Sequence, residues 1–163
     1  MSGSHWLPMS KAIRHCGEHS RGVRCPPMTL APPFAEWPPE LREELEANSA
    51  NPAVGTRLLL EDEYARHWEI RLAPGERIAF HRHVLDYVWT CVSGGTAISH
   101  TGDGETLEVS YEVGETRRLS FGPGEWMVHD LANAGDEDLI FTTIEYLASA
   151  NDALPLDRTS AAA

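Results

Sequence analysis

The sequence has very little positive charge. Lys11 is its only lysine, and 13 basic residues stand against 25 acidic ones, which gives a formal net charge of −12. Proteins that bind nucleic acids need clustered lysine and arginine to neutralise phosphates, so the composition argues against that class of partner. An acidic surface does not favour anionic membranes either. We therefore expect neither a nucleic acid nor a membrane as a partner.

Long hydrophobic runs and paired cysteines are also missing. The longest apolar runs, such as residues 58–60, fall far short of the roughly 20 residues that span a bilayer. The N-terminus lacks the apolar core of a secretory signal, so we expect a cytoplasmic protein. Cys16, Cys25 and Cys91 are odd in number and not spaced as CxxC, which predicts free thiols rather than a disulfide framework or a cysteine zinc site.

The 163 residues suit a single domain, which is large enough to bury a core without disulfides. Residues 1–27 are basic, unlike the rest of the chain, and have no periodic apolar pattern, so we interpret them as a disordered N-terminal extension. The domain is expected over residues 28–147. It begins with a proline-rich arm and a short helix at 39–48, where proline and acidic residues suit the first turn. The small, polar residues of 148–163 predict a flexible tail.

From Thr56 onward, apolar and polar residues alternate in short runs separated by turns that contain glycine or proline. This period of two predicts antiparallel strands. Many short strands with no helix between them fit either a β-sandwich or a closed barrel such as the jelly roll. The expected strands are 56–61, 65–72, 77–83, 87–93, 95–100, 105–112, 116–121, 126–131 and 139–147.

Two histidines stand two positions apart on one of these expected strands. Because successive side chains of a strand alternate between its faces, His81 and His83 point the same way. If that face lines an apolar interior, a metal ion satisfies the ring nitrogens without a protonation penalty. On an exposed edge strand the pair would simply be solvated, and the run alone leaves both interpretations open.

Together with a later segment, this run resembles the cupin family, whose first motif is G-x5-H-x-H-x3,4-E-x6-G and whose second motif ends in H-x3-N. The matching residues are Gly75, His81, His83 and Gly94 in the first motif, and His129 and Asn133 in the second. In cupins the three histidines converge on one metal ion inside a jelly-roll barrel. The resemblance therefore implies an all-β jelly-roll fold and a metal site formed by His81, His83 and His129. It also implies a homodimer.

The chain departs from the first motif at the glutamate. Tyr87 stands where that metal-binding carboxylate would be, and Asp86 is one position early. Neighbouring residues of a strand face opposite sides, so only one of the two faces the metal unless a turn at 84–86 absorbs the offset. Both are kept as candidate catalytic residues. The pattern HxHxxDY is also similar to that of small single-domain cupins of β-alanine degradation.

Three neutral imidazoles leave the full charge on a divalent metal and leave positions open for substrate. We expect one metal per chain, with Fe(II) favoured and Zn, Mn or Ni as alternatives. Fe(II) suits dioxygenase-type oxidative cleavage of a small organic carbonyl or acid, whereas the other metals suit a Lewis-acid isomerase or lyase. Cupins also include non-catalytic proteins, so a small-metabolite-binding module is a further alternative. Trp89, Tyr87 and Met127 are candidate walls of the site.

Overall fold

The computed structural model describes residues 34–156. The expected N-terminal extension at 1–27, the start of the arm, and residues 157–163 of the expected tail lie outside the described residues. Within the described part, a 3-10 turn η2 (Phe34–Glu36) and a helix α1 (Pro39–Asn48) precede nine β-strands. The prediction of an all-β fold with a short N-terminal helix is confirmed.

The strands follow the predicted alternation to within a few residues at their ends. They are β1 (Arg57–Glu61), β2 (Ala65–Leu72), β3 (Arg77–His83), β4 (Tyr87–Ser93), β5 (Gly95–His100), β6 (Thr106–Tyr111), β7 (Thr116–Leu119), β8 (Met127–Asn133) and β9 (Leu139–Tyr146). Strand β8 runs two residues beyond the expected end because Ala132 pairs with Arg77 of β3 and Asn133 with Ala97 of β5.

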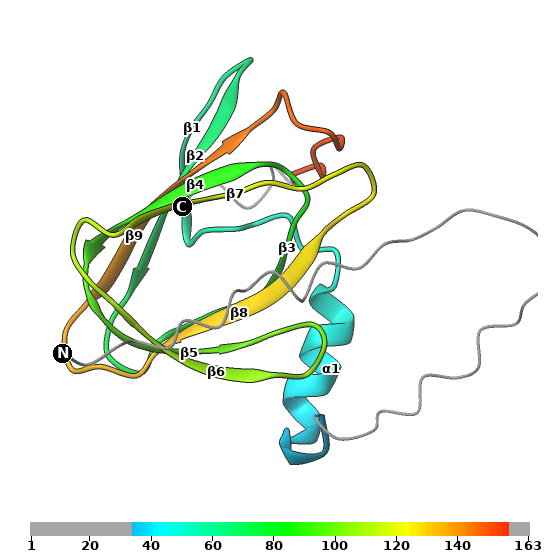
Figure 1. Ribbon diagram of the computed structural model, residues 1–163. Coiled ribbons are helices and arrows are strands. Elements are labelled where there is room, and N and C mark those ends of the chain that lie inside the picture. The colour runs from blue at the N-terminus through cyan, green and yellow to red at the C-terminus, as the bar shows by residue number, and fades with distance from the viewer. Residues whose placement is uncertain (1–33, 157–163) are drawn as a thin grey trace, which may run out of the picture.

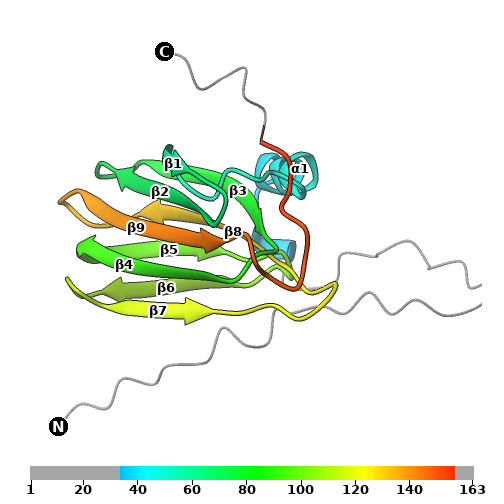
Figure 2. The same ribbon diagram turned by 90° about the horizontal axis from the view of Figure 1, so that it is seen from above.

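The strands form two antiparallel sheets that face each other (Figure 1; Figure 2, from above). One sheet has the order β1-β2-β9-β4-β7 and the other the order β3-β8-β5-β6. The chain changes sheet between β2 and β3, returns at β4, and changes again at β5, which is the double-sheet closure of a jelly roll. As a result β3 and β8, which are far apart in the sequence, lie side by side.

A hydrophobic cluster fills one end of the space between the sheets. It contains Ile70 and Leu72 of β2, Leu139 and Phe141 of β9, and Leu131 of β8, all of them buried. Burial of each such side chain is worth roughly 1.5–3 kcal/mol. This cluster joins the two sheets without including the histidines.

The local structure requires glycine at both glycine positions of the first motif, for two different reasons. Gly75 has a φ of 80° in the turn before β3, a conformation that L side chains rarely adopt. Gly94 leads into β5, where a Cβ atom would lie 2.5 Å from the carbonyl oxygen of Tyr111. A side chain at either position would disturb a strand that borders the histidine site or its cavity.

Helix α1 lies against the outer face of the sheet that holds β3 and β8, as Figure 1 shows. The contact includes Phe34 and Trp37, which bury Phe80 of β3 and Val128 of β8 in a small aromatic cluster. Proline at the first helical position and the following glutamate suit the helix start, as expected from the sequence. No helix in the described part of the chain is long and apolar enough to cross a membrane.

Residues 148–156, the described part of the expected tail, contact loops of the domain. The side-chain amide of Asn151 donates to the carbonyl of Val84 at 2.9 Å, and the hydroxyl of Ser149 accepts from the backbone N–H of Asp86, also at 2.9 Å. The small polar side chains here thus act as hydrogen-bond partners for loop backbone.

Candidate metal centre

Three histidines converge on the inner face of the second sheet. His81 and His83 lie on β3, and His129 lies on the neighbouring strand β8 directly opposite His81 in the register. One ring nitrogen of each lies within 4.8 Å of the other two. The ring centroids of His81 and His129 are 4.6 Å apart. The structure thus brings together the three residues that the sequence indicated as metal ligands.

Hydrogen bonds orient two of the three rings. The Nδ1 atom of His81 donates to the carbonyl oxygen of Ala79 at 2.9 Å. The hydroxyl of Ser99 donates to the carbonyl of Asp130 at 2.7 Å and lies 3.4 Å from Nδ1 of His129, from which it accepts. Each contact places the ring proton on Nδ1 and leaves Nε2 with a free lone pair. Such outer hydrogen bonds are how metal-binding histidines are held in the correct tautomer.

The burial of the imidazoles keeps them neutral. His81 is completely buried, and burial lowers its pKa below the usual value of free imidazole. Burial also lowers the pKa of His83 and His129 well below that value, and the neighbouring rings add to the effect. A metal ligand must be the neutral imidazole, so these residues already have the protonation state that metal binding requires.

The ring nitrogens fit a divalent metal ion. Among the described residues, Nε2 of His81 and Nδ1 of His83 are buried without a hydrogen-bond partner. The Nε2 atoms of His83 and His129 lie 3.1 Å apart, where at most one of them can donate to the other. Leaving a buried polar atom unpaired costs about 1–3 kcal/mol, and coordination by a cation removes that cost. The set of nitrogen donors suits Zn, Fe, Ni or Cu rather than Mg or Ca.

Tyr87 lies directly against the histidines. Its ring stacks on that of His83, with the centroids 4.3 Å apart and the planes inclined by 20°. Burial raises the pKa of the Tyr87 phenol far above its ordinary value, so the phenol stays protonated. Tyr87 is therefore a neutral neighbour of the metal centre that can donate a hydrogen bond but does not belong to the three-histidine group.

Asp86 faces the other way, so the structure does not bring this candidate catalytic residue together with the three histidines. Its carboxylate accepts from the backbone N–H of Phe121 at 2.9 Å and contacts Arg118 at 3.3 Å, outside the cavity that the histidines line. The loop before β4 does not absorb the one-residue offset, and β4 begins at Tyr87 with its side chain inward. Alternation along the strand then directs the carboxylate away from the metal centre.

The sequence reasoning missed Glu145, an acidic residue in the interior. It lies opposite Tyr87 in the register between β4 and β9, is only 3% exposed, and its Oε2 accepts a hydrogen bond from Nε1 of Trp68 at 2.8 Å. Burial raises the pKa of Glu145 to about 7, although Trp68 and Arg66 oppose the shift. The alternation of β9 carried the signal, since Phe141, Thr143 and Glu145 share one face.

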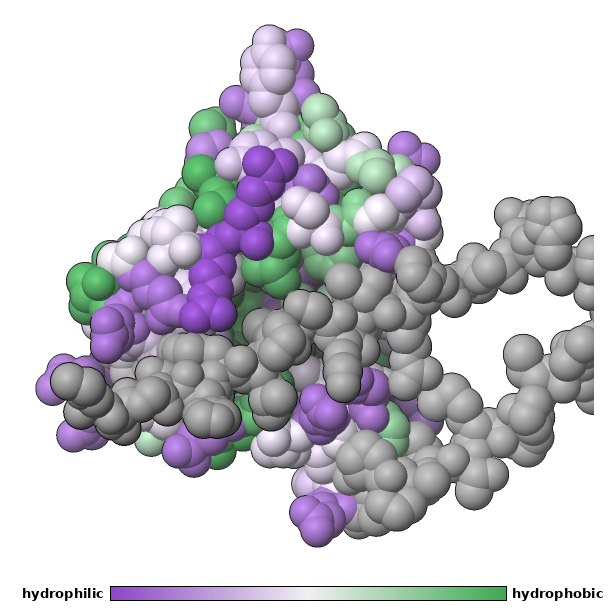
Figure 3. Space-filling view, in the orientation of Figure 1, coloured by the Kyte–Doolittle hydropathy of each residue, from purple (hydrophilic) through white to green (hydrophobic). Residues whose placement is uncertain are grey.

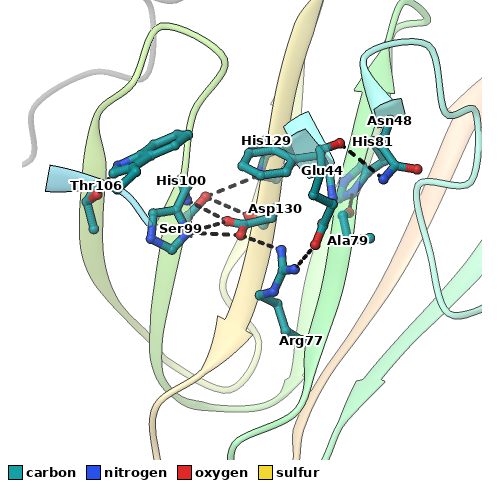
Figure 4. A network of polar contacts seen from close by, with 12 residues as sticks. Glu44, Asn48, Arg77, Ala79, His81, Ser99, His100, Thr106, His129 and Asp130 are labelled. Atoms are coloured by element: carbon teal, nitrogen blue, oxygen red, sulfur yellow. Dashed lines mark hydrogen bonds and ion pairs between the residues drawn. The ribbon is translucent and has the colours of Figure 1, made fainter. Parts of the chain in front are cut away.

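A second polar network lies behind the metal centre, on the outer face of the same sheet (Figure 4). Asp130, next to His129, is completely buried and forms an ion pair with Arg77 at 2.8 Å. It also accepts from the backbone N–H of His100 at 2.5 Å and contacts Nδ1 of the same residue at 2.9 Å. Arg77 in turn bonds to Glu44 of α1. The network fastens α1 to the strands that carry the metal ligands.

A cavity of about 900 Å³ opens onto the three histidines. Its walls include Tyr87 and Trp89, as predicted, together with Ile70, Leu131 and Phe141. Figure 3 shows hydrophobic side chains recessed behind hydrophilic ones on the side where the two sheets part. Met127 does not line the cavity but packs with Tyr87 and Phe121 in the core, so its prediction as a wall is wrong. A small organic molecule fits a cavity of this size.

No model of a protein family and no curated protein matches this chain. A solved cupin domain from Bordetella pertussis Tohama I is 25% identical over 60% of this chain and 95% of its own, with a TM-score of 0.49. An uncharacterised conserved protein with a double-stranded β-helix domain from Klebsiella pneumoniae is 26% identical over 72% of this chain and 95% of its own, with a TM-score of 0.47.

A third solved structure, described as a predicted oxalate decarboxylase from Thermotoga maritima, is 21% identical over 55% of this chain and 76% of its own, with a TM-score of 0.40. The solved structures to which this chain is similar thus include cupins, the family that its two histidine motifs resemble.

Proposed function

We propose that this protein is a metal-dependent enzyme that acts on a small organic carbonyl or acid, by dioxygenase-type oxidative cleavage with Fe(II) held by His81, His83 and His129. One observation carries the proposal. The three neutral imidazoles, of which His81 and His83 are buried and His129 is half-buried, include a ring nitrogen of His81 that has no hydrogen-bond partner among the described residues, and they face a cavity large enough for a small substrate.

The protein's own residues prepare this chemistry in three ways. Ala79 and Ser99 hold the rings of His81 and His129 with their Nε2 lone pairs free. Tyr87 stacks on His83 and offers a protonated phenol at the cavity wall. The apolar walls exclude water, which strengthens the attraction between a chelating substrate and the centre. A bound Fe(II) ion would supply positions for substrate and O₂, together with the electrons that activate O₂.

A Lewis-acid isomerase or lyase that uses Zn, Mn or Ni is the second candidate, and Glu145 favours it. Proton transfer at neutral pH is most efficient with a group whose pKa lies near 7, and burial raises the pKa of Glu145 to about 7. This carboxyl lies opposite Tyr87 in the register, on the sheet that faces the histidines, and Tyr87 rather than Glu145 lines the cavity. A non-catalytic metabolite-binding protein would use the same cavity without turnover.

Metal analysis of protein purified without a histidine tag tests both candidates. We expect about one metal ion per chain. The Fe(II)-loaded protein should consume O₂ with a small 1,3-dicarbonyl compound, and the three histidine-to-alanine variants should lose this activity together. Turnover by the Zn(II) or Mn(II) form without O₂ would favour the isomerase or lyase. A tightly bound metabolite with no turnover of any kind would favour the binding protein.

We also propose a homodimer, supported by the edge strand β1. Leu59 and Leu60 on this strand are about half exposed, at 48% and 52%, and Tyr64 in the following turn is 70% exposed. In the described sheet β1 pairs only with β2, so its other edge has free backbone groups beside apolar side chains. Such an edge favours pairing with another strand. A monomer mass by light scattering would contradict the proposal, whereas loss of the dimer in Leu60→Glu would support it.

A further inference from the structure

The inner face of β6 is apolar but only half covered by protein. Exposed and half-buried residues alternate along this strand, and the half-buried ones are Leu107, Val109 and Tyr111. They share one face because side chains two positions apart in a strand point the same way. That face is the inner one, since Val109 pairs with the completely buried Ala97 of β5. All three residues line the cavity that opens onto the histidines.

The wall opposite β6 is apolar as well. Trp89 of β4 and Phe141 of β9 lie there, and their ring centroids are 5.5 Å and 4.9 Å from that of Tyr111, edge to face. Trp89, like Tyr111, is only partly buried. Ile70 and Leu131 also line the cavity. Part of this apolar surface is therefore uncovered by protein and available to a ligand.

The charged residues near this surface do not place a net charge inside the cavity. Glu108 alternates to the outer face of β6 and is exposed, and Glu112, which follows the strand, is exposed as well. Arg117 of β7 pairs with Trp89 in the register and so shares its inner side. Its guanidinium binds the carboxylate of Glu115 through Nε at 2.8 Å and through Nη2 at 2.7 Å. A ligand in this part of the cavity thus meets apolar walls and a closed ion pair.

The cavity is larger than a chelating group requires. Strand β7 ends the first sheet and β6 ends the second, and residues of both edge strands line the cavity between them. Its volume of about 900 Å³ lies near the upper limit of sites that hold small organic ligands. A group that binds a metal ion through two oxygen atoms occupies only a small part of this space. The apolar part remains for the rest of the substrate.

We propose that the substrate joins a chelating oxygen-containing head to an uncharged, apolar tail at least the size of a phenyl ring. This inference rests on the proposed function for the head and adds the tail. The tail displaces water from half-covered apolar side chains, which favours binding in proportion to the apolar area removed from water. An aromatic tail also gains edge contacts with Trp89 and Tyr111. A carboxylate tail would lose its hydration without gaining a partner.

Three probes that share one 1,3-dicarbonyl head and one short spacer test the tail. They end in a phenyl, a methyl or a carboxylate group. Binding is measured by calorimetry on the Zn(II)-loaded protein, so no turnover is needed. We expect the phenyl compound to bind about tenfold more tightly than the methyl compound, with a more negative heat-capacity change, and the carboxylate compound to bind most weakly. High salt should not reduce the preference for phenyl over methyl, because neither tail is charged.

Matched variants assign this preference to the cavity. Val109→Phe fills part of the space for the tail and should reduce the ratio of phenyl to methyl affinity from about tenfold towards about one. The control is the same substitution at Val92 of β4, which is 49% exposed and does not line the cavity. Val92→Phe should keep the full ratio. Val109→Thr retains the shape of valine but adds a hydroxyl, so it should lower the ratio severalfold even if Val109→Phe fails to fold.

The outcomes separate this inference from the proposed function. If protein with full metal content binds the phenyl compound no more tightly than the methyl or the carboxylate compound, the inference is overturned and the metal centre is left intact. The same holds if folded Val109→Phe and Val92→Phe have equal ratios, or if none of the three probes binds to the loaded protein. Failure to take up any divalent metal would instead contradict the proposed function itself.

Discussion

Strand β8 has two very different polar environments on its two faces. On the inner face, His129 joins His81 and His83, where two buried ring nitrogens have no hydrogen-bond partner among the described residues. On the outer face, the adjacent Asp130 is completely buried, yet both of its carboxylate oxygens are bonded. Two neighbouring residues thus differ in whether the protein itself satisfies them.

The contrast separates stability from function. Buried polar groups in native proteins are nearly always paired, so a group left unpaired points to a missing ligand. The outer network of Asp130, Arg77 and Glu44 is complete, and its evident effect is to hold α1 on the sheet. The inner group is incomplete, and its three nitrogen donors could hold a divalent metal ion. Substitutions on the two faces should therefore have different consequences.

The largest expected effect is the loss of metal from the inner face. His81→Ala, His83→Ala and His129→Ala should each abolish stoichiometric metal binding, because two remaining imidazoles form a poor site. His67→Ala, on β2 outside the cluster, is the control and should keep the metal. Elemental analysis of untagged protein measures the result. Metal at the wild-type level in two of the three variants would contradict the assignment.

Substitutions on the outer face of β8 should change the stability of the protein. Asp130→Asn removes the buried carboxylate charge that binds Arg77, although Arg77 keeps its pair with Glu44. The loss of these charge-assisted hydrogen bonds should lower the free energy of unfolding by about 1.5–3 kcal/mol. The control is Asp138→Asn, which breaks the exposed pair with Arg71 and should cost no more than about 1 kcal/mol. Urea denaturation of the metal-free proteins gives both values. Similar decreases in the free energy of unfolding of the two variants would contradict the expectation that the buried network contributes more to stability than the exposed ion pair.

Glu145 should make stability depend on pH. Its pKa is about 7 in the folded protein, against 4.5 for the free side chain, so the folded state holds this proton more tightly than the unfolded state. The free energy of unfolding should therefore decrease as the pH rises from about 4.5 to about 7, by up to about 3 kcal/mol. In Glu145→Gln this contribution disappears. Denaturation of both proteins at pH 4.5 and pH 8 tests the sign, and a steeper fall in the variant would contradict it.

The smallest expected effect concerns Asp86. Because its carboxylate binds the N–H of Phe121 and contacts Arg118 rather than the histidines, Asp86→Asn should leave the metal content unchanged. The weakened hydrogen bonds should cost only about 1 kcal/mol of stability. Complete loss of metal from a folded Asp86→Asn variant would show that Asp86 is a metal ligand and belongs with the three histidines.

Much of the fold could be predicted because alternation is a local signal. The expected helix has the bounds found in the structure, and most strand ends agree to within two residues. The histidine pair on β3 follows from the same rule, since His81 and His83 must share a face. The composition of residues 148–156 did not indicate the contacts of Ser149 and Asn151, because these are with loops far away in the sequence.

The sequence by itself determined which residues share a strand face and which segments turn, because both depend on near neighbours along the chain. Only the tertiary structure decided what each face meets. The pairing of β3 with β8 brings His129 opposite His81, and the facing sheet adds Tyr87 and the buried Glu145. Asp86 and Asp130 carry the same side chain, yet Asp86 is partly exposed in a loop and Asp130 is completely buried in a strand. The burial, the pKa and the hydrogen bonds of a side chain are set by residues that are far away in the sequence but close in the fold, and a single sequence does not identify them.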